Sequence, residues 1–270
     1  MPEAVVGKDI VVTRGPRVVI SASDVRIPQG GITAVIGPNG SGKSTLLHAI
    51  AGLLTPSAGT LTVLGATPAL SQPRISYVLQ YSTIPPGTPL TVREAVMMAR
   101  YPSLGLLGRP SKSDRQRVEA ALERLDIVDL ADRHLHELSG GQRQRVYVAQ
   151  GIAQDHEMLL LDEPLTGLDM TSAKTIDAII HDEPSRGCSV VITTHDLEEA
   201  RAADYVVLMS SRVVAHGRPE STLTAENLTI AYGLGALHTS DETPSIAPDD
   251  HHHHDHGLGH DHAHGHSHDH

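Results

Sequence analysis

The sequence predicts an α/β fold, with a mostly parallel sheet covered by helices, an antiparallel β-subdomain at the amino-terminal end and a helical insertion. Three observations lead to this prediction. Short β-rich runs come first along the chain. Apolar strands later alternate with helical stretches, which is typical of a parallel sheet buried on both faces. Between about residues 91 and 150 the spacing is helical, which indicates an insertion into that sheet.

The elements follow in order along the chain. DIVVT, RVVIS and DVRIP are separated by Gly, Pro and Asp, so we expect separate strands. ITAVIGPNGSGKSTLLHAIAGLL predicts a strand, a Gly-rich loop and a helix, and GTLTVLG and ISYVLQ predict two more strands. TVREAVMMAR opens with the capping-box pair Thr91 and Glu94, SKSDRQRVEAALERLDIVDLADR keeps helical spacing, and LSGGQRQRVYVAQGIAQ starts another helix. MLLLD, SVVITT and YVVLM return to strands, separated by the helical stretches TSAKTIDAIIHD and DLEEARAA.

Composition limits the class of protein. We expect one domain over residues 1–235, with a helical subdomain over about residues 88–150, and a linker with a His/Asp-rich tail over 236–270. The chain has no Trp, no Phe and six Tyr, so the core must be aliphatic. Its net charge is −11, of which five charges belong to Asp residues between 249 and 270. The remaining body is mildly acidic and does not favour nucleic-acid binding.

The single cysteine, Cys188, excludes an internal disulfide and fits a reducing cytoplasm. It adjoins the strand SVVITT, and we interpret it as a core residue. No apolar run approaches the roughly 20 residues that a membrane-spanning helix needs, and MPEAVVGKD does not resemble a signal peptide.

A phosphate-binding loop is the strongest motif. The pattern G-x-x-x-x-G-K-[ST] lies between a predicted strand and a predicted helix, as a P-loop requires. Its glycines let backbone N–H groups surround phosphate oxygens, and the helix amino terminus adds partial positive charge. We expect Lys43 to reach the β- and γ-phosphates of ATP and the Ser44 hydroxyl to bind Mg²⁺. The predicted ATP-binding residues of this loop are Gly37, Pro38, Asn39, Gly40, Ser41, Gly42, Lys43, Ser44 and Thr45.

Two acids follow the apolar run MLLL at the end of a later strand. Asp162 is placed to hold Mg²⁺ directly or through water. Glu163 is placed to polarise an attacking water as the general base. Together with the phosphate-binding loop, this pair predicts a P-loop core that hydrolyses nucleoside triphosphates.

The pentapeptide LSGGQ, between the phosphate-binding loop and LLLDEP, resembles the signature of ATP-binding cassette (ABC) transporter ATPases. The resemblance covers about residues 5–233. Gln80 after ISYVL, Gly167-Leu168-Asp169 after the acids, and His195 after VVITT fall in the order of that family. The order of these short motifs makes the resemblance specific.

The resemblance implies a head-to-tail homodimer of ATPase subunits that encloses two ATP molecules. The signature residues, which contact the partner subunit's ATP, are Ser139, Gly140, Gly141 and Gln142. Gln80 is implied to sense Mg²⁺ and water and to touch the membrane subunit. The loop at Asp169 is implied to cross the dimer seam, and His195 to bond the γ-phosphate and orient Glu163. Independently, Ser139 and two glycines at a helix start form a second anion site, which a single chain cannot easily fold onto the first.

One position departs from the family pattern. An aromatic residue near the first hairpin normally stacks on adenine, and the matching place in VVTRGPRVV carries Arg14. A guanidinium plane can stack on a purine. Arg14 as an exposed residue in a turn is the alternative, and the sequence leaves both open.

The stretch LTVREAVMMARYPSLGLLGRPSKSDRQRVEAALERLDI resembles ATPases of zinc and manganese importers, and more loosely those for siderophores and cobalamin. This implies a subunit at the cytoplasmic face of the membrane, held there by integral permease subunits. An extracytoplasmic metal-binding protein is then the indirect partner. A soluble ABC ATPase of cluster assembly remains the alternative from another class.

The end of the chain, HHHHDHGLGHDHAHGHSHDH, mixes imidazole with carboxylate, both ligands for zinc-like ions. An engineered tag, a natural zinc-binding tail and a low-complexity segment without a role are the open interpretations. The irregular mixture of Asp, Gly and Ala favours the second, and imidazole suits Zn²⁺ better than manganese. The candidate ligands are His251, His252, His253, His254, His256, His260, His262, His264, His266, His268 and His270.

Overall fold

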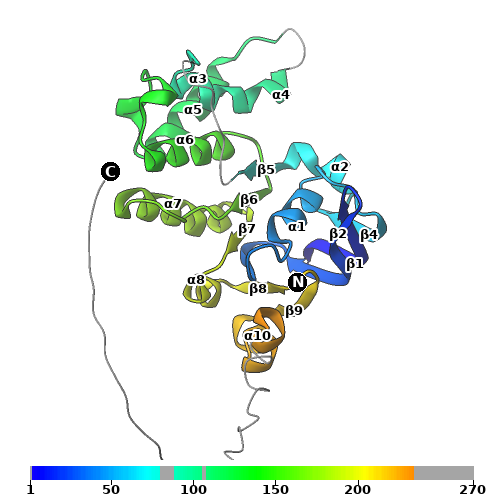
Figure 1. Cartoon of the computed structure of the whole chain (residues 1–270). Helices are drawn as coiled ribbons and strands as arrows, with labels where there is room; N and C mark the ends of the chain where they lie inside the picture. Colours follow the sequence, from blue (N-terminus) through cyan, green and yellow to red (C-terminus); the bar gives the residue numbers. More distant parts are fainter. Residues whose placement is uncertain (1, 80–87, 105–107, 234–270) are drawn as a thin grey trace, which may run out of the picture.

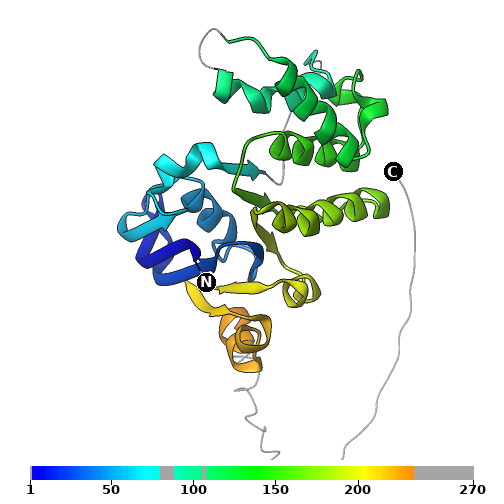
Figure 2. The same ribbon diagram turned by 180° about the vertical axis from the view of Figure 1, so that it is seen from behind.

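The computed structural model describes residues 2–79, 88–104 and 108–233. A central sheet carries an antiparallel β-subdomain on one side and a group of helices from the middle of the chain above it (Figure 1). The view from behind shows the same three parts (Figure 2). This arrangement agrees with the fold class that the sequence predicts.

The antiparallel subdomain is a three-stranded sheet in the order β2 (Arg17–Pro28), β1 (Glu3–Arg14) and β4 (Ala58–Val63). The expectation of separate strands for RVVIS and DVRIP is wrong, because both belong to the continuous strand β2. The register shifts between Gly7 and Ile10, and within that bulge the Asp24 carboxylate accepts a hydrogen bond of 2.8 Å from the Asp9 N–H. The polar residues therefore stand at a bulge and not at a turn.

The main sheet has six strands, and every neighbouring pair is parallel except the last, which is antiparallel. Their spatial order is β5 (Ile75–Val78), β6 (Met158–Asp162), β7 (Ser189–Thr194), β3 (Gly31–Ile36), β8 (Tyr205–Met209) and β9 (Val213–Gly217).

The helices divide between the two faces of this sheet. In chain order they are α1 (Lys43–Ile50), α2 (Pro68–Ser71), α3 (Val92–Met97), α4 (Tyr101–Leu104), α5 (Lys112–Arg124), α6 (Gly140–Ile152), α7 (Met170–Asp182), α8 (Leu197–Ala202), α9 (Pro219–Thr222) and α10 (Ala225–Tyr232). Short 3₁₀ turns are η1 (Gln72–Arg74), η2 (Met98–Arg100), η3 (Val128–Leu130), η4 (Leu135–Glu137) and η5 (Glu183–Arg186).

Both faces of the main sheet are buried, as a parallel sheet requires. In β6, Leu159 and Leu161 pack with the helices of the insertion, whereas Leu160 packs with α1 and the antiparallel subdomain. The core side chains are aliphatic, as the composition predicts. Because β3, β7 and β6 pair in parallel, their carboxyl ends meet at one edge of the sheet.

The helical insertion is tied together by one buried arginine. Arg100 in η2 donates to Asp114 Oδ1 (2.9 Å) in α5, to the Ala153 carbonyl (3.1 Å) after α6, and to Asp155 (3.0 Å). Thr91 begins α3 with the capping box to Glu94 that the sequence predicts.

The carboxyl-terminal end of helix α6 packs directly against strand β5 of the sheet. A Cβ atom added at Gly151 would lie 2.7 Å from Val78 Cγ2 and 3.0 Å from Ser76 Oγ in β5. Only glycine permits this approach of helix to strand. Within the described residues, no helix combines the length and apolar character needed to cross a bilayer.

Candidate nucleotide-binding site

The phosphate-binding loop joins β3 to α1 and needs glycine at two places. A Cβ atom at Gly37 would lie 2.2 Å from the Met209 carbonyl oxygen in β8, so the loop can pass β8 only without a side chain. Gly42, directly before α1, has a φ of +103°, a conformation that L side chains rarely adopt. The loop therefore turns sharply into the amino terminus of α1, where unpaired N–H groups favour an anion.

Lys43 lies within this loop, with its side chain folded over it. Its ammonium donates hydrogen bonds to the carbonyl oxygens of Gly37 (2.9 Å) and Pro38 (3.4 Å). Burial lowers the pKa of Lys43, while the nearby charges of Glu163 and Asp162 act in the opposite direction. A phosphate group would supply the negative charge that such a buried ammonium favours.

Asp162, at the end of β6, is held by three side chains. Ser44 Oγ donates to its Oδ1 at 3.1 Å, and Thr193 Oγ1 donates to the same oxygen at 2.6 Å. Tyr77 O–H donates to Oδ2 at 3.3 Å, and burial, followed by the charge of Asp162, raises the pKa of that phenol. The structure thus brings together Ser44 and Asp162, the two described residues that the sequence assigns to Mg²⁺.

Glu163 follows in an uncommon backbone conformation, with a φ of +48°. A positive φ at a residue other than glycine costs free energy, and such residues are enriched at functional sites, although Asp9, Leu64, Asp126 and Ser211 share this conformation here. The Glu163 N–H donates to Thr193 Oγ1 at 2.8 Å, which ties this turn to β7. His195, exposed directly after β7, follows Thr193 at the same edge of the sheet, where β7 pairs with β6.

Arg14 lies at the end of β1, beside the phosphate-binding loop. Its guanidinium donates a hydrogen bond to His48 Nδ1 in α1, and the His48 ring meets the Tyr77 ring edge-on at 5.4 Å. Burial, and then the Arg14 charge, lower the pKa of His48, so its neutral ring can accept this bond. Arg14 is exposed beside the turn at residues 15–16, as the alternative expects, and His48 holds its guanidinium next to the phosphate-binding loop. Stacking of Arg14 on adenine stays a prediction.

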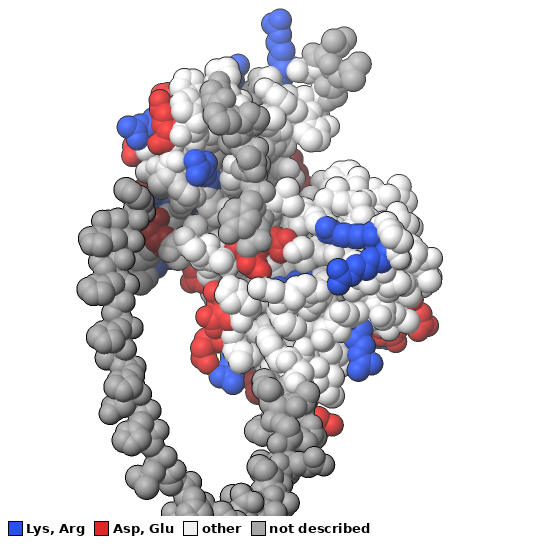
Figure 3. Space-filling view, viewed as in Figure 1, with Lys and Arg blue, Asp and Glu red and all other residues white. Residues whose placement is uncertain are grey.

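These residues line a cleft of about 320 Å³ that combines the loop with Arg14, Arg17 and Glu163. Basic side chains lie over the β1–β2 region in Figure 3, whereas acidic ones gather around α8. A larger cleft of about 880 Å³, lined by Arg26 and Asp204, lies at the opposite end of β3 and contains none of the motif residues. We place the nucleotide in the smaller cleft because the phosphate-binding chemistry is there.

The signature residues lie at the start of α6, where Ser139 and Gly140 are exposed and Gly141 is buried against Asp169. Ser139 caps this helix by accepting from the Gln142 N–H (3.2 Å), and Gln142 Oε1 accepts from the Ser139 N–H (3.0 Å). Asp169 caps α7 in the same way, and the hydrogen bond from the Ser172 N–H is the main cause that lowers its pKa. A Cβ atom at Gly141 would lie 2.3 Å from Asp169 Oδ2, so the two caps are in direct contact.

Some predicted site residues are not covered by this geometry. Gln80 and the histidines of the tail lie outside the described residues. The sequence interpretation missed Tyr77, Thr193 and His48, which hold Asp162 and Arg14. Tyr77 and Thr193 stand near the carboxyl ends of the strands ISYVLQ and SVVITT, so a hydroxyl-bearing side chain close to the end of a predicted strand was the available signal.

The comparison with known proteins decides the family. A sequence profile described as "ABC transporter" matches residues 20–166. The chain belongs to the ABC transporter family. As an ABC ATPase it binds ATP and hydrolyses it in coupling to transport, and the resemblance drawn from its motifs is confirmed.

Relatives of this ABC ATPase include subunits of metal transport systems. The zinc transport system ATP-binding protein TroB of Treponema pallidum is 41% identical over 211 residues, 78% of this chain and 79% of that protein. The manganese transport system ATP-binding protein MntB of Listeria monocytogenes is 38% identical over 218 residues, 80% of this chain and 91% of that protein.

The fold agrees with solved ABC ATPases. A chain of an ABC transporter described as of metal-chelate type, in an inward-facing conformation, superposes with a TM-score of 0.74 at 30% identity. The superposition covers 86% of this ABC ATPase and 89% of that chain. The predicted P-loop α/β core is thereby confirmed.

Proposed function

We propose that this ABC ATPase energises a membrane permease that imports a divalent transition-metal ion. Zinc is the favoured ion, and manganese is the alternative. The proposal is carried by the relatives named for zinc and manganese transport, which align over about four fifths of the chain. The sequence of the helical insertion favours the same substrate class independently, and the tail adds metal ligands.

In this proposal ATP lies in the cleft above the phosphate-binding loop. Its phosphates are surrounded by the backbone N–H groups of residues 37–45 and by the amino terminus of α1. Lys43 exchanges its carbonyl partners for the β- and γ-phosphate oxygens, which compensate its buried charge better than dipoles do. The plane of Arg14, fixed by His48, stacks on the adenine ring.

Ser44 and Asp162 offer the donor set that Mg²⁺ prefers, a hydroxyl and a carboxylate oxygen only 3.1 Å apart. Gln80 is the third proposed ligand. When bound, the ion neutralises charge on the phosphate oxygens. Thr193 and Tyr77 hold the Asp162 carboxylate in place while this happens.

For hydrolysis, Glu163 accepts a proton from the water that attacks the γ-phosphorus, and the bond to the bridging oxygen of ADP breaks. The strained turn at Glu163 is tied to β7 through Thr193, so the carboxylate is positioned before substrate arrives. His195 bonds the γ-phosphate and orients Glu163, and Gln80 orients the water.

We place the second anion site in a head-to-tail homodimer. Ser139, Gly140, Gly141 and Gln142 of one subunit then face the γ-phosphate held by the other. Asp169 crosses the seam next to them, and its contact with Gly141 supports a shared movement of these two segments.

The assembly that follows consists of permease subunits, this homodimer at the cytoplasmic face of the membrane, and an extracytoplasmic metal-binding protein that delivers the ion. Residues 1–235 form the ATPase domain, with its helical subdomain over about 88–150. Residues 236–270 form a linker and a tail that binds Zn²⁺.

Deletion of the gene, followed by measurement of growth and cellular metal content, tests the substrate. We expect low cellular zinc and growth restored by added zinc or by the wild-type gene, but not by the Glu163→Gln variant. Restoration by manganese alone would move the assignment to manganese. Unchanged contents of both metals would overturn the proposed function.

A further inference from the structure

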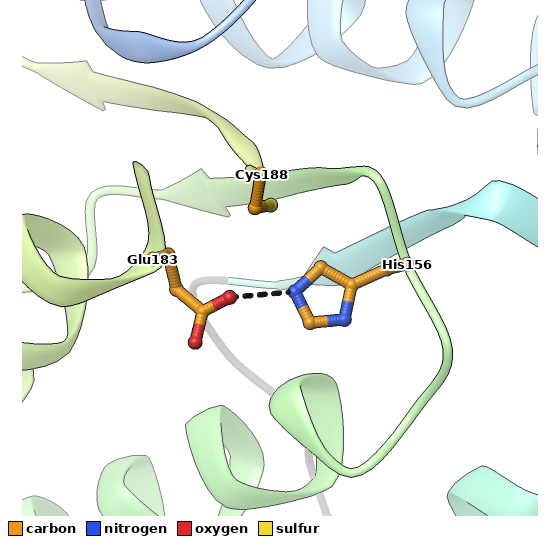
Figure 4. A group of neighbouring side chains, drawn as sticks. All are labelled: His156, Glu183 and Cys188. Carbon is orange, nitrogen blue, oxygen red and sulfur yellow. Dashed lines mark hydrogen bonds and ion pairs between the residues drawn. The ribbon is translucent and has the colours of Figure 1, made fainter. Parts of the chain in front are cut away.

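Three buried side chains meet at the end of the sheet opposite the ATP cleft. His156 precedes β6, Glu183 begins η5 and Cys188 precedes β7, and their polar ends face one another (Figure 4). All three ligand atoms lie within 4.8 Å of one another. The side chains of His156 and Glu183 are 6% and 3% exposed, and Cys188 is 3% exposed.

From this geometry we propose that His156, Glu183 and Cys188 form a binding site for a zinc-like divalent ion, separate from the ATP site. Imidazole, carboxylate and thiolate are the ligands of structural zinc sites, and a thiolate excludes Mg²⁺ and disfavours Mn²⁺ as the preferred ion. Zinc bond lengths place tetrahedral ligand atoms about 3.3–3.8 Å apart. Side-chain rotations that shorten the separations between the three ligand atoms by about 1 Å are therefore enough to form the site.

The surroundings of the three residues support coordination. His156 Nδ1 faces the Gln154 carbonyl at 3.1 Å, which turns Nε2 toward Glu183 Oε2, also at 3.1 Å. Arg124 donates to the other Glu183 oxygen at 2.6 Å. Metal ligands are typically oriented by such outer partners, a carbonyl for the imidazole and a donor for the carboxylate.

Coordination exchanges protons for the ion. His156 Nε2 lies toward Glu183 Oε2, and Nδ1 lies toward the Gln154 carbonyl, so Nε2 is the imidazole atom placed to bind an ion between the side chains. On binding, a metal–sulfur bond forms as the Cys188 S–H bond breaks, and a metal–nitrogen bond forms at Nε2. The displaced protons pass to solvent.

The alternative is that His156 and Glu183 form only a structural ion pair beside an inert thiol. The Cys188 sulfur distinguishes the two interpretations. Metal binding requires its thiolate as a ligand, whereas an ion pair between His156 and Glu183 does not involve it. The sequence contains no other cysteine, so a thiolate-to-metal absorption band can come only from Cys188, even though the tail offers many histidines.

Titration of the full chain with Cd²⁺, followed by its ultraviolet thiolate charge-transfer band, tests the site. We expect a band whose final intensity corresponds to one thiolate per chain and which is displaced by Zn²⁺. Cys188→Ser should abolish the band, and His156→Gln and Glu183→Gln should weaken binding by more than about 100-fold, since loss of an outer partner alone costs about 10–100-fold. His181→Gln, at an exposed histidine of α7, is the matched control and should leave the band unchanged.

Folding is checked separately by ATP hydrolysis, which Cys188→Ser should retain because the cluster lies at the far ends of β6 and β7. Zn²⁺ should raise the unfolding temperature of the wild type more than that of Cys188→Ser. Absence of the band in active wild-type protein, or equal Cd²⁺ affinity of the wild type and His156→Gln, would overturn the proposal. Neither result bears on which ion the permease transports.

Discussion

Ser44 Oγ, in the first turn of α1, lies 3.1 Å from Asp162 Oδ1 at the end of β6. The two residues are separated by 118 positions in the sequence, and the parallel sheet brings them together. Because β3 and β6 run in the same direction with β7 between them, the segment after each strand emerges at one edge.

Glu163→Gln should bind ATP normally but hydrolyse it about 10²–10⁴-fold more slowly, because an amide cannot accept the proton of the attacking water. The Glu163 N–H bond to Thr193 is unaffected, so the turn keeps its shape. Nucleotide binding and steady-state phosphate release are the two measurements, with Glu226→Gln, at an exposed acid of α10, as the control. Turnover close to that of the wild type would remove Glu163 from its assigned role.

Lys43→Ala should weaken ATP binding about 10- to 100-fold, since charged hydrogen bonds contribute about 1.5–3 kcal/mol. Equilibrium binding of a fluorescent ATP analogue measures the effect. Lys112→Ala, which removes an exposed ammonium from α5, is the matched control and should bind as the wild type does. Equal affinities for all three proteins would contradict the placement of the phosphates.

Ser139→Arg should bind ATP as an isolated subunit but fail to dimerise, because the long side chain fills the space intended for the partner's γ-phosphate. The test is best made in the Glu163→Gln background, where ATP should trap the dimer. Size-exclusion chromatography with ATP then compares the double variant with Glu163→Gln alone. Ser139→Ala controls for loss of the α6 cap, which costs about 1 kcal/mol. A dimer formed by the Arg variant would contradict the sandwich arrangement.

Asp114→Asn should destabilise the protein at neutral pH. Hydrogen bonds from Ser111, and then from Arg100, lower the pKa of Asp114 to about 2, so its carboxylate favours the folded state above its unfolded pKa of 3.8. This contribution is lost as the pH falls from about 4 through about 2. The difference in unfolding temperature between wild type and variant should therefore be constant above pH 5 and narrow below about pH 4. Asp129→Asn, at an exposed acid of the same subdomain, is the control for the substitution itself.

Deletion of residues 249–270 should leave ATP hydrolysis intact and remove most of the zinc-binding capacity. At pH 7 most tail histidines are neutral, with a reference pKa of about 6.5, and free to coordinate. We expect the tail to bind Zn²⁺ with moderate affinity and a mixed stoichiometry, and to release it below about pH 6. Zinc or nickel should bind more tightly than manganese. Calorimetric titration of both forms with Zn²⁺ is the measurement. Equal uptake by both would mean that the tail is not a metal-binding element.

The parts of the site that lie within one continuous motif could be predicted from the sequence. The phosphate-binding loop, the acids after β6 and the capped start of α6 each have their chemistry fixed by neighbours in the chain. Alternating strands and helices were likewise enough for the fold class. Local sequence determines such features because their contacts span only a few residues.

Contacts between distant segments could not be predicted. The hydrogen bond from Arg14 to His48 depends on how the β1–β2 hairpin lies over α1, which no local pattern encodes. Cys188 was interpreted as a core residue, and it is buried, but its neighbours His156 and Glu183 come from two other segments. The sequence predicts a strand boundary at Asp24, whereas Asp24 lies in β2 opposite a bulge of β1, because a polar residue at a bulge resembles one at a turn in sequence.

Arg100 joins η2, α5 and the residues after α6 into one unit, and Gly151 holds that unit against Val78 in β5. We infer that these contacts let the insertion turn as one unit relative to β5, with Gly151 near the axis and Ser139 at the far end of α6. A protein docked on α3 or α5 would then displace Ser139 as well. We therefore expect a bulkier residue at position 151 to shift the resting angle of the insertion and so alter how readily two subunits close on ATP.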